Sequence, residues 1–290
     1  MDTQQERRET PSSDRVPGYE GEEERLGPTE RLGLRLGHAF AYRLRRLSQL
    51  WTWYVMFWPI WLCISRRLRH EGFERLDALP RDASVIIVAN HRTFFDFYIL
   101  SACLCRLTRM APRVNFPVRS TFFYDRPLGV ALNLIAAGMT MYPPFFRDKP
   151  QLRLNRSSLA ICVELLQRPG AVLGIHPEGT RNKNADPYEL LPGQFGVGQI
   201  IARAPARTRV YPMFALGLTD NVLVELWKNW FAPRAWPIDL LIGEPLDFSD
   251  VRGDKGAPSV RAVRDVVARC MDAVQKLGLR VRALRAQRPK

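Results

Sequence analysis

The chain has 290 residues, enough for one large domain with an appendage or for two modest domains. Its 46% hydrophobic and 25% charged residues are ordinary for a globular protein with a sizeable core, and its five cysteines, without a repeated Cys-x-x-Cys spacing, argue against a disulfide framework or a metal site. The formal net charge of +14 points to an anionic partner, such as nucleic acid, anionic lipid or a phosphate-bearing substrate.

The first 31 residues differ from the rest of the chain in charge and composition. They hold nine acidic and five basic residues and almost no large apolar ones. Such a segment cannot bury enough surface to offset its chain entropy, so we expect residues 1–31 to form a disordered acidic tail. No apolar stretch of the secretory type opens the chain, and we expect its bulk to stay in the cytoplasm, where cysteines are reduced.

Residues 32–70 have the character of a membrane-associated helical segment. An apolar run of 15 residues, 50–64, contains four tryptophans, and tryptophan prefers the membrane interface. Arginines on both sides of the run match anionic headgroups. The run is shorter than the ~20 residues of a spanning helix, and Pro59 interrupts it. We therefore expect a bent helical hairpin that lies in one leaflet, with a single span or a buried core helix as the alternatives.

From residue 71 onward, runs with strand character and runs with helix character alternate. The expected strands are 84–90, 138–142, 171–175, 209–216 and 238–242. The expected helices are 94–105, 121–136, 157–167 and a last helix that Ser259 caps. This alternation predicts an α/β fold over residues 71–279, with a mostly parallel sheet flanked by helices. The basic tail that follows, residues 280–290, either contacts anionic headgroups or is a solvated helix end.

Two polar residues with catalytic potential follow the expected strand 84–90. His91 comes directly after it, and Asp96 lies five residues later, at the start of the next helix. A carboxylate on one imidazole nitrogen fixes the tautomer and leaves the other nitrogen free to take a proton, which makes a general base for a hydroxyl nucleophile. On spacing alone we favour the alternative, in which Asp96 only begins a helix and His91 is a polar loop residue.

The segment 176–181, His-Pro-Glu-Gly-Thr-Arg, follows the expected strand 171–175. Gly179 allows close backbone approach, and Arg181 offers a planar fork for phosphate. Glu178 can accept hydrogen bonds from hydroxyls. The alternative is a β-turn with a solvated charge pair. A third segment, 138–147, ends in Arg147 and is weak evidence by itself.

Together these segments resemble the glycerolipid acyltransferases, the 1-acylglycerol-3-phosphate O-acyltransferases and their relatives. That family carries an NHxxxxD block, a Gly-to-Arg block, a PEGTR block and a hydrophobic-Pro block in this order, and the resemblance covers roughly residues 70–250. The matching segments are Asn90–Asp96, Gly138–Arg147, Pro177–Arg181 and Val210–Phe214. Four departures bear on the acceptor headgroup. The second block is long, His176 replaces a usual Phe, Arg119 stands where Lys is common, and residues 191–196 replace a common Lys-x-Gly segment.

The resemblance implies transfer of a fatty acyl group from acyl-CoA or acyl carrier protein to a lysophospholipid hydroxyl, above all that of 1-acylglycerol-3-phosphate, in phospholipid biosynthesis. His91 is then the base and Asp96 its partner. The implied substrate-binding residues are Arg119, Arg147, Glu178, Gly179, Thr180 and Arg181. The resemblance implies no metal and no cofactor beyond the thioester co-substrate. It also implies membrane lipids, especially anionic ones, as partners at the cytoplasmic face.

Three other functions are weighed against this one. The altered second block keeps open acyl transfer to another lysolipid, such as an aminolipid or a glycolipid. A catalytically inactive membrane-binding protein of the same fold is disfavoured, because His91 and Asp96 are both present. A basic protein that binds nucleic acid would show a reader motif or basic clusters interleaved with aromatic residues, and we find neither.

Overall fold

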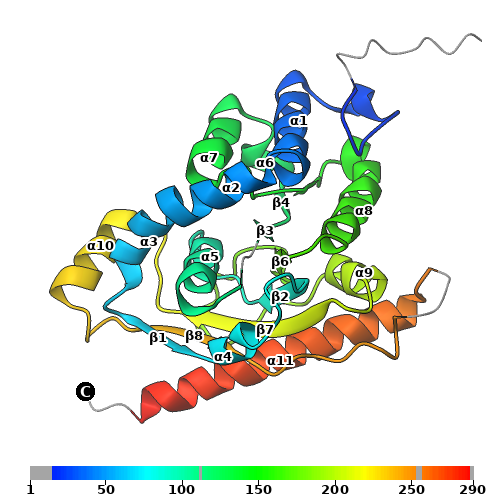
Figure 1. The fold of residues 1–290 in the computed structure, drawn as a ribbon. Coiled ribbons are helices and arrows are strands. Elements are labelled where there is room, and N and C mark those ends of the chain that lie inside the picture. Colours follow the sequence, from blue (N-terminus) through cyan, green and yellow to red (C-terminus); the bar gives the residue numbers. More distant parts are fainter. Residues whose placement is uncertain (1–14, 111–112, 253–256, 288–290) are drawn as a thin grey trace, which may run out of the picture.

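The computed structural model describes residues 15–110, 113–252 and 257–287. A six-stranded sheet of order β1-β8-β7-β2-β6-β3 lies at its centre, with helices on both faces (Figure 1). Its strands are β1 Leu68–Glu71, β2 Val85–Ala89, β3 Arg113–Asn115, β6 Ala171–Ile175, β7 Arg209–Leu216 and β8 Ile238–Ile242. Every neighbouring pair is parallel except β7 and β8. The expected α/β fold with a mostly parallel sheet is confirmed.

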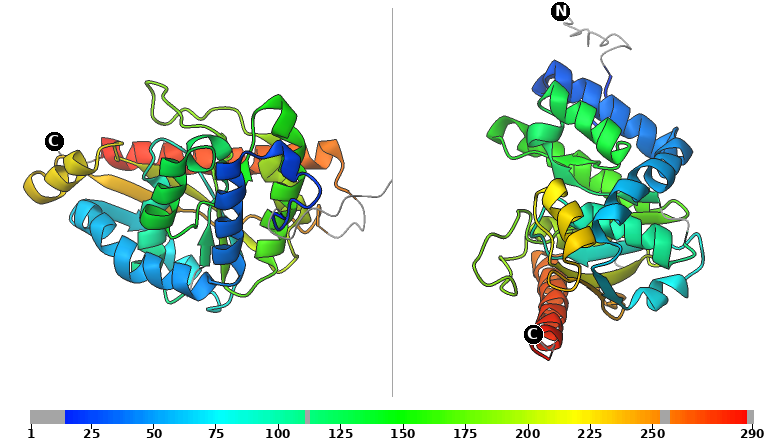
Figure 2. Two further views of the ribbon diagram at one scale, coloured as in Figure 1. Left: turned by 90° about the horizontal axis from the view of Figure 1, so that it is seen from above. Right: turned by 90° about the vertical axis from the view of Figure 1, so that its left-hand side faces the viewer.

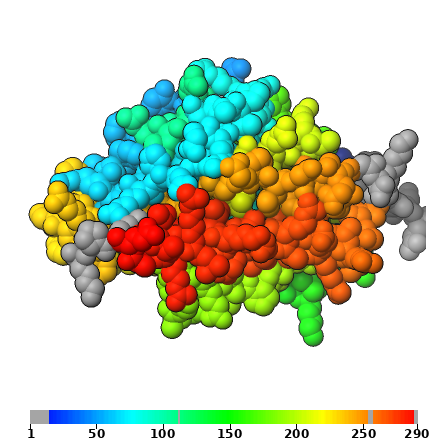
Figure 3. All heavy atoms as spheres, turned by 90° about the horizontal axis from the view of Figure 1, so that it is seen from below, coloured from blue at the N-terminus to red at the C-terminus, as the bar shows by residue number. Residues whose placement is uncertain are grey.

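Alternate residues of the central strands feed two apolar cores on opposite faces of the sheet. In β2, Val85 and Ile87 join the first core, whereas Ile86 and Val88 join the second. The first face is covered by α3 Phe57–Ile64, α4 Phe73–Asp77 and α5 Asp96–Leu107, and the second by α8 Asn155–Leu166, α9 Phe195–Arg203 and α11 Val260–Ala286. Figure 3 shows α11 running across the second face. Burial on both faces explains why these strands are continuously apolar.

A third core lies at one end of the sheet, among elements that frame the site (Figure 2). These elements are α1 Pro28–Tyr42, η3 Lys149–Leu154, α6 Ser120–Phe123, α8 and the two-stranded sheet of β4 Val118–Arg119 and β5 Pro144–Phe145. Helix α7 Pro127–Ala137 lies against α1 and α6. The expectation of disorder for residues 1–31 is wrong for their second half: Val16, Tyr19 and Leu26 are buried in this core, and a short helical turn, η1 Glu23–Arg25, precedes α1. Local composition misses this, because the packing partners lie far along the chain. Residues 1–14 fall outside the described residues.

Residues 32–64 form a bent helical path (Figure 1). The expected helical segment 32–70 is too long at its end, because residues 68–70 pair with β8 as part of strand β1. After α1 come α2 Arg45–Trp51, a π-helical turn η2 Thr52–Met56, and α3. The wide turn directly precedes the proline-containing turn of α3, where Pro59 has no N–H to donate and its ring would clash in a regular helix. Within the described part of the chain, no helix is both long and apolar enough to cross a bilayer.

Two expected elements differ from the structure around Gly138. Residues 138–142 are not a strand, because Gly138 and Met139 have φ angles of 56° and 58° and end α7. The strand of this segment is β5, residues 144–145, which pairs with β4. The expected helix 121–136 is broken at Phe122, where φ is 79°. The side chain of Asn133 donates to the carbonyl of Met141 at 3.2 Å, a contact within the fold that local patterns do not reveal.

The C-terminal helix continues past the expected boundary at residue 280 and ends at Ala286. Arg280 pairs with Glu71 at 2.7 Å, and Arg285 pairs with the buried Asp239 at 2.6 Å. These residues are therefore part of the folded domain as far as residue 287. Three helices were not expected from the sequence, namely α4, α9 and α10 Val222–Phe231. Helix α10 packs against α3.

Candidate active site

His91 lies just beyond the carboxyl end of β2, and the neighbouring residue Asn90 sets its position. The Asn90 side chain donates to the Ala215 carbonyl at 2.9 Å and accepts from the Ala215 N–H at 2.7 Å. These two bonds continue the pairing of β2 with β7 for one residue after the strand ends. The chain therefore leaves the sheet at a defined point, and His91 begins the turn that leads to α5.

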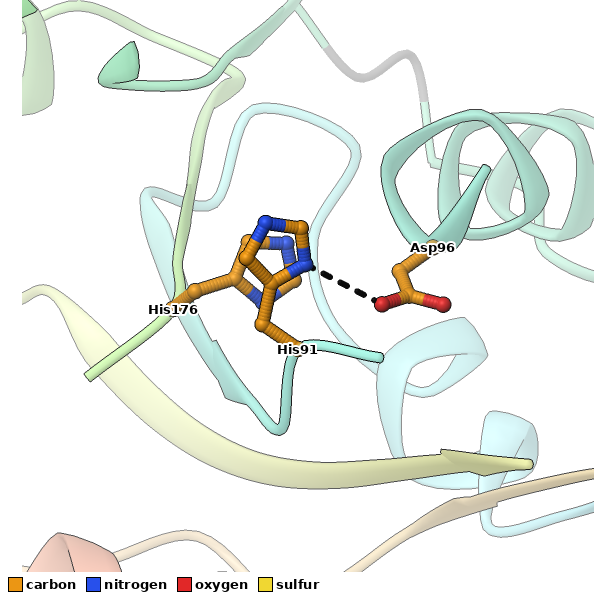
Figure 4. A group of neighbouring side chains, drawn as sticks. All are labelled: His91, Asp96 and His176. Atoms are coloured by element: carbon orange, nitrogen blue, oxygen red, sulfur yellow. Dashed lines mark hydrogen bonds and ion pairs between the residues drawn. The ribbon is translucent and has the colours of Figure 1, made fainter. Parts of the chain in front are cut away.

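The His91 and Asp96 side chains meet across this turn, with Nδ1 of His91 3.2 Å from Oδ2 of Asp96 (Figure 4). Asp96 is the first residue of α5, while residues 91–95 are non-helical, so the five-residue spacing is no obstacle. The imidazole Nδ1 faces a carboxylate, which only accepts, so this nitrogen carries the proton. The second nitrogen, Nε2, is then the one that can accept a proton from a substrate.

The Asp96 carboxylate is buried and fully hydrogen-bonded. The backbone N–H groups of Arg92 and Thr93 donate to Oδ2 at 2.6 and 2.9 Å, and the Thr93 hydroxyl donates to Oδ1 at 2.7 Å. Burial by itself raises the pKa of Asp96, but the His91 hydrogen bond, the two nearby imidazoles and the Thr93 N–H together lower it below its usual value. Asp96 stays ionised and can balance an imidazolium at His91.

The ring of His176 stacks on the ring of His91, with the centroids 4.0 Å apart and 7° between the planes. Both residues follow parallel neighbouring strands, in which Val88 of β2 lies opposite Ile175 of β6. His176 Nδ1 lies 3.1 Å from the Ala89 carbonyl and therefore donates to it. Burial, followed by the charge of His91, lowers the pKa of His176 to about 3, so this ring is neutral at neutral pH.

The two histidines and Asp96 also invite comparison with a metal site, because one ligand atom of each lies within 4.8 Å of the others. An imidazole lone pair lies in the ring plane, so two parallel rings 4.0 Å apart cannot both direct a lone pair at one ion. The Asp96 oxygen that faces His91 also accepts two backbone N–H groups. The arrangement fits a hydrogen-bonded base better than a metal centre.

Glu178 supports the backbone of the catalytic turn. It is only 1% exposed, and its two oxygens accept the backbone N–H groups of His91 and Leu191, each at 2.8 Å. The backbone N–H of Asn182 donates to the His91 carbonyl at 2.7 Å. This corrects the expected role of Glu178 as a partner for substrate hydroxyls, because both oxygens are buried and engaged. Glu178 and Asn182 thus hold the His91 backbone at both its N–H and its carbonyl.

Arg119 and Arg147 converge on the carbonyl of Gly179. Arg119 donates through Nε and Nη2 at 3.3 and 3.2 Å, and Arg147 donates through Nη2 at 3.0 Å. Burial, and then the charges of Arg147 and Arg181, lower the pKa of Arg119, so the three guanidinium groups are close enough to repel one another. Each has further N–H donors, and a shared anion would relieve the repulsion.

The remaining residues of the 176–181 segment shape this cationic cluster. Gly179 has a φ of 63°, and a Cβ there would lie 2.8 Å from Cγ of Gln194, so a side chain is excluded on two grounds. Thr180 is half-buried in the same turn. Arg181 pairs with the exposed Asp220 at 2.9 Å. The structure therefore brings together every expected arginine, including Arg147 at the end of the long second block.

A cavity of about 440 Å³ opens on the Asp96 side of the turn. Its lining includes Arg92, Thr93, Lys228, Trp236 and Arg285. These residues come from separate segments of the chain, and no sequence pattern links them. The sequence singles out only Arg92 and Thr93, because they lie within the block that contains His91 and Asp96.

The comparisons with known proteins bear on this site directly. A family model described as Acyltransferase matches residues 71–215, half the length of the chain. The matched region contains His91, Asp96, both converging arginines and the segment 176–181. A comparison with curated proteins gave no match.

Proposed function

The chain belongs to the acyltransferase family, and we propose that it moves a fatty acyl group from an acyl thioester to the hydroxyl of a lysophospholipid, with 1-acylglycerol-3-phosphate as the favoured acceptor. The observation that carries this proposal is the His91–Asp96 pair beyond the carboxyl end of β2, 3.2 Å apart, on the same side of the sheet as the cluster of three arginines. The pair supplies a base, and the arginines supply a site for an anionic headgroup.

In the proposed reaction, the acceptor hydroxyl gives its proton to Nε2 of His91 while its oxygen attacks the thioester carbonyl. A carbon–oxygen bond forms, and the carbonyl electrons move to the oxygen to give a tetrahedral oxyanion. When the oxyanion collapses, the carbon–sulfur bond breaks and the imidazolium of His91 returns the proton to the departing thiolate. Asp96 holds the tautomer and balances the imidazolium, as its low pKa allows.

Acceptor selection rests on the cluster formed by Arg119, Arg147 and Arg181. A phosphate monoester carries up to two negative charges and several acceptor oxygens, which suits multiple guanidinium groups. Acyl-CoA or acyl carrier protein is the proposed donor, because both present anionic groups to a basic protein of net charge +14. His91 and Asp96 are intact and correctly paired, which speaks against an inactive protein of the same fold.

We also propose that residues 32–70 hold the protein at the cytoplasmic face of a membrane. Tyr54 and Trp58 are 67% and 57% exposed, and arginines flank the helical path on both sides. Exposed aromatic side chains next to cations suit the interface of an anionic leaflet. An amphiphilic acceptor lies in such a leaflet, so a site held at its surface has direct access to it.

The test is an assay of the purified protein with radiolabelled palmitoyl-CoA against a panel of lysolipids. His91→Ala is compared with His70→Ala, which removes an exposed histidine of β1. We expect acylation of 1-acylglycerol-3-phosphate by the wild type and the His70 variant, and none by the His91 variant. Acylation of a different lysolipid alone would move the acceptor to an aminolipid or glycolipid. Equal turnover by both variants would refute the role of His91.

A further inference from the structure

Helix α10 has its polar and apolar sides inverted relative to a helix that packs on a core. Its buried residues are Glu225, Lys228 and Asn229. Its exposed residues include Leu223, Trp227 and Phe231, with 75%, 54% and 76% of their surfaces accessible. Burial of apolar surface stabilises a fold in water, so a surface helix ordinarily turns its apolar side inward. The orientation of α10 calls for an apolar environment outside the domain.

This orientation is fixed by buried polar contacts. Glu225 forms an ion pair with Arg67 at 2.6 Å, and both side chains are almost fully buried. Asn229 accepts from the backbone N–H of Arg66 at 2.9 Å and donates to the Leu62 carbonyl at 2.8 Å. Rotating α10 to hide its apolar side would leave these groups buried without partners, at a high cost. The exposed apolar side is therefore a built feature of the fold.

The exposed side of α10 continues onto the neighbouring helical path. Helices α10 and α3 lie side by side (Figures 1 and 2). Trp58 and Leu62 are 57% and 46% exposed there, and Trp230 on α10 is 45% exposed. The guanidinium of Arg66 lies 5.5 Å from the ring of Trp230, which places a cation at the edge of this apolar surface.

The unpaired exposed charges on the segments that carry this surface are positive. Over residues 57–69 and 221–237, all of them described, the exposed charged side chains are those of Arg66, Arg69 and Arg234. The one carboxylate in these segments, Glu225, is 2% exposed and paired with Arg67. The nearest exposed carboxylate, Asp220 just before α10, is paired with Arg181. An apolar surface rich in tryptophan, with arginines at its rim, complements a leaflet that contains anionic lipids.

We infer that α10 is a second lipid-binding element, which enters the interface of an anionic leaflet together with α3. The start of helix α10 lies close to the His91–Asp96 turn in space. Asp220, two residues before α10, accepts from the Phe94 N–H at 2.6 Å and pairs with Arg181 at 2.9 Å. Docking of α10 thus holds the catalytic turn and the arginine cluster beside the leaflet. The function assigned to this docking rests on the proposed function, because it assumes that the acceptor is a lipid. The test measures membrane binding and does not depend on acyl transfer.

The test measures binding of the full chain to lipid vesicles. Vesicles of phosphatidylcholine with phosphatidylglycerol are compared with pure phosphatidylcholine vesicles in a flotation assay, with no substrate present. The triple variant Leu223→Gln, Trp227→Gln, Phe231→Gln removes only side chains that are more than half exposed. The control, Val260→Gln with Leu279→Gln, changes two exposed apolar residues of α11, the helix that packs on the second core. Circular dichroism and thermal unfolding report whether each variant folds.

We expect the triple variant to need roughly 100-fold more lipid than the wild type for half-binding, because three inserted side chains are lost. The control should bind like the wild type, and mixed vesicles should bind better than neutral ones at low salt. Equal binding by the triple variant and the wild type would overturn the inference. A wild-type dimer that the triple variant dissociates, with unchanged vesicle binding, would also overturn it and identify a second copy of the chain as the partner. His91→Ala should bind vesicles normally, which separates this result from any failure of catalysis.

Discussion

Replacement of Asp96 by Asn tests the electrostatic part of the catalytic pair with little change in shape. The amide oxygen can keep the two backbone N–H groups of Arg92 and Thr93, while the amide nitrogen faces the Thr93 hydroxyl, which can turn to accept. The turn therefore survives, at a cost of about 1–3 kcal/mol for the lost charge-assisted bonds. A neutral amide no longer balances an imidazolium at His91, and we expect kcat to fall roughly 10³-fold.

The control for this change is Thr93→Val, which removes the hydroxyl bond to Asp96 but keeps the carboxylate. We expect a similar loss of stability, about 1–3 kcal/mol in urea unfolding, with kcat within a few-fold of the wild type. Acyl transfer is measured with radiolabelled acyl-CoA under saturating conditions. The reasoning is refuted if Asp96→Asn keeps near wild-type kcat, or if Thr93→Val loses as much activity as Asp96→Asn.

The same pair predicts a pH dependence of stability. The pKa of Asp96 in the fold is lower than its ordinary value of 3.8, so the unfolded chain binds a proton first as the pH falls. The stability that the ionised carboxylate contributes is therefore present above that value and is lost as the pH drops through the lower folded pKa. Asp96→Asn lacks this contribution, and its unfolding free energy should change less with pH in the acid range.

Three further changes test the surrounding residues. His176→Phe keeps a flat ring against His91. The pKa of His176 is about 3 in the fold and 6.5 in the unfolded chain, so the unfolding free energy of the wild type should fall by about 2 kcal/mol between about pH 7.5 and about pH 5. The variant should not show this fall when unfolding is measured in urea. Glu178→Gln sets an amide N–H against a buried backbone N–H. We expect about 2 kcal/mol less stability, and a lower kcat with an unchanged KM for the acceptor. A rise in KM alone would contradict the supporting role of Glu178. Arg147→Ala should raise KM for a phosphate monoester acceptor about tenfold and change it little for lysophosphatidylcholine, and equal effects on both would argue against headgroup binding.

Local sequence patterns determined the framework of this protein. The strands 171–175, 209–216 and 238–242 have the expected bounds, because strands buried on both faces are rich in apolar residues. The last two end directly before Gly217 and Gly243. The capping of the last helix by Ser259 is also confirmed, with its side chain accepting from the Ala262 N–H at 3.1 Å. The His91–Asp96 pair was a candidate from its place after a strand, but the spacing alone favoured a polar loop residue and a helix-start Asp. The resemblance to the acyltransferases is what favoured a catalytic pair.

Only the tertiary structure decided what the other polar residues do. Glu178 and His91 are 87 residues apart in the chain, and β2 and β6 must pair before the carboxylate reaches the His91 N–H. The convergence of Arg119 and Arg147 on Gly179 likewise depends on how separate segments pack. The exposed apolar side of α10 depends on the buried Arg67–Glu225 pair. A sequence pattern records which residues are apolar along one element, whereas the direction in which that element faces is set by contacts with distant parts of the chain.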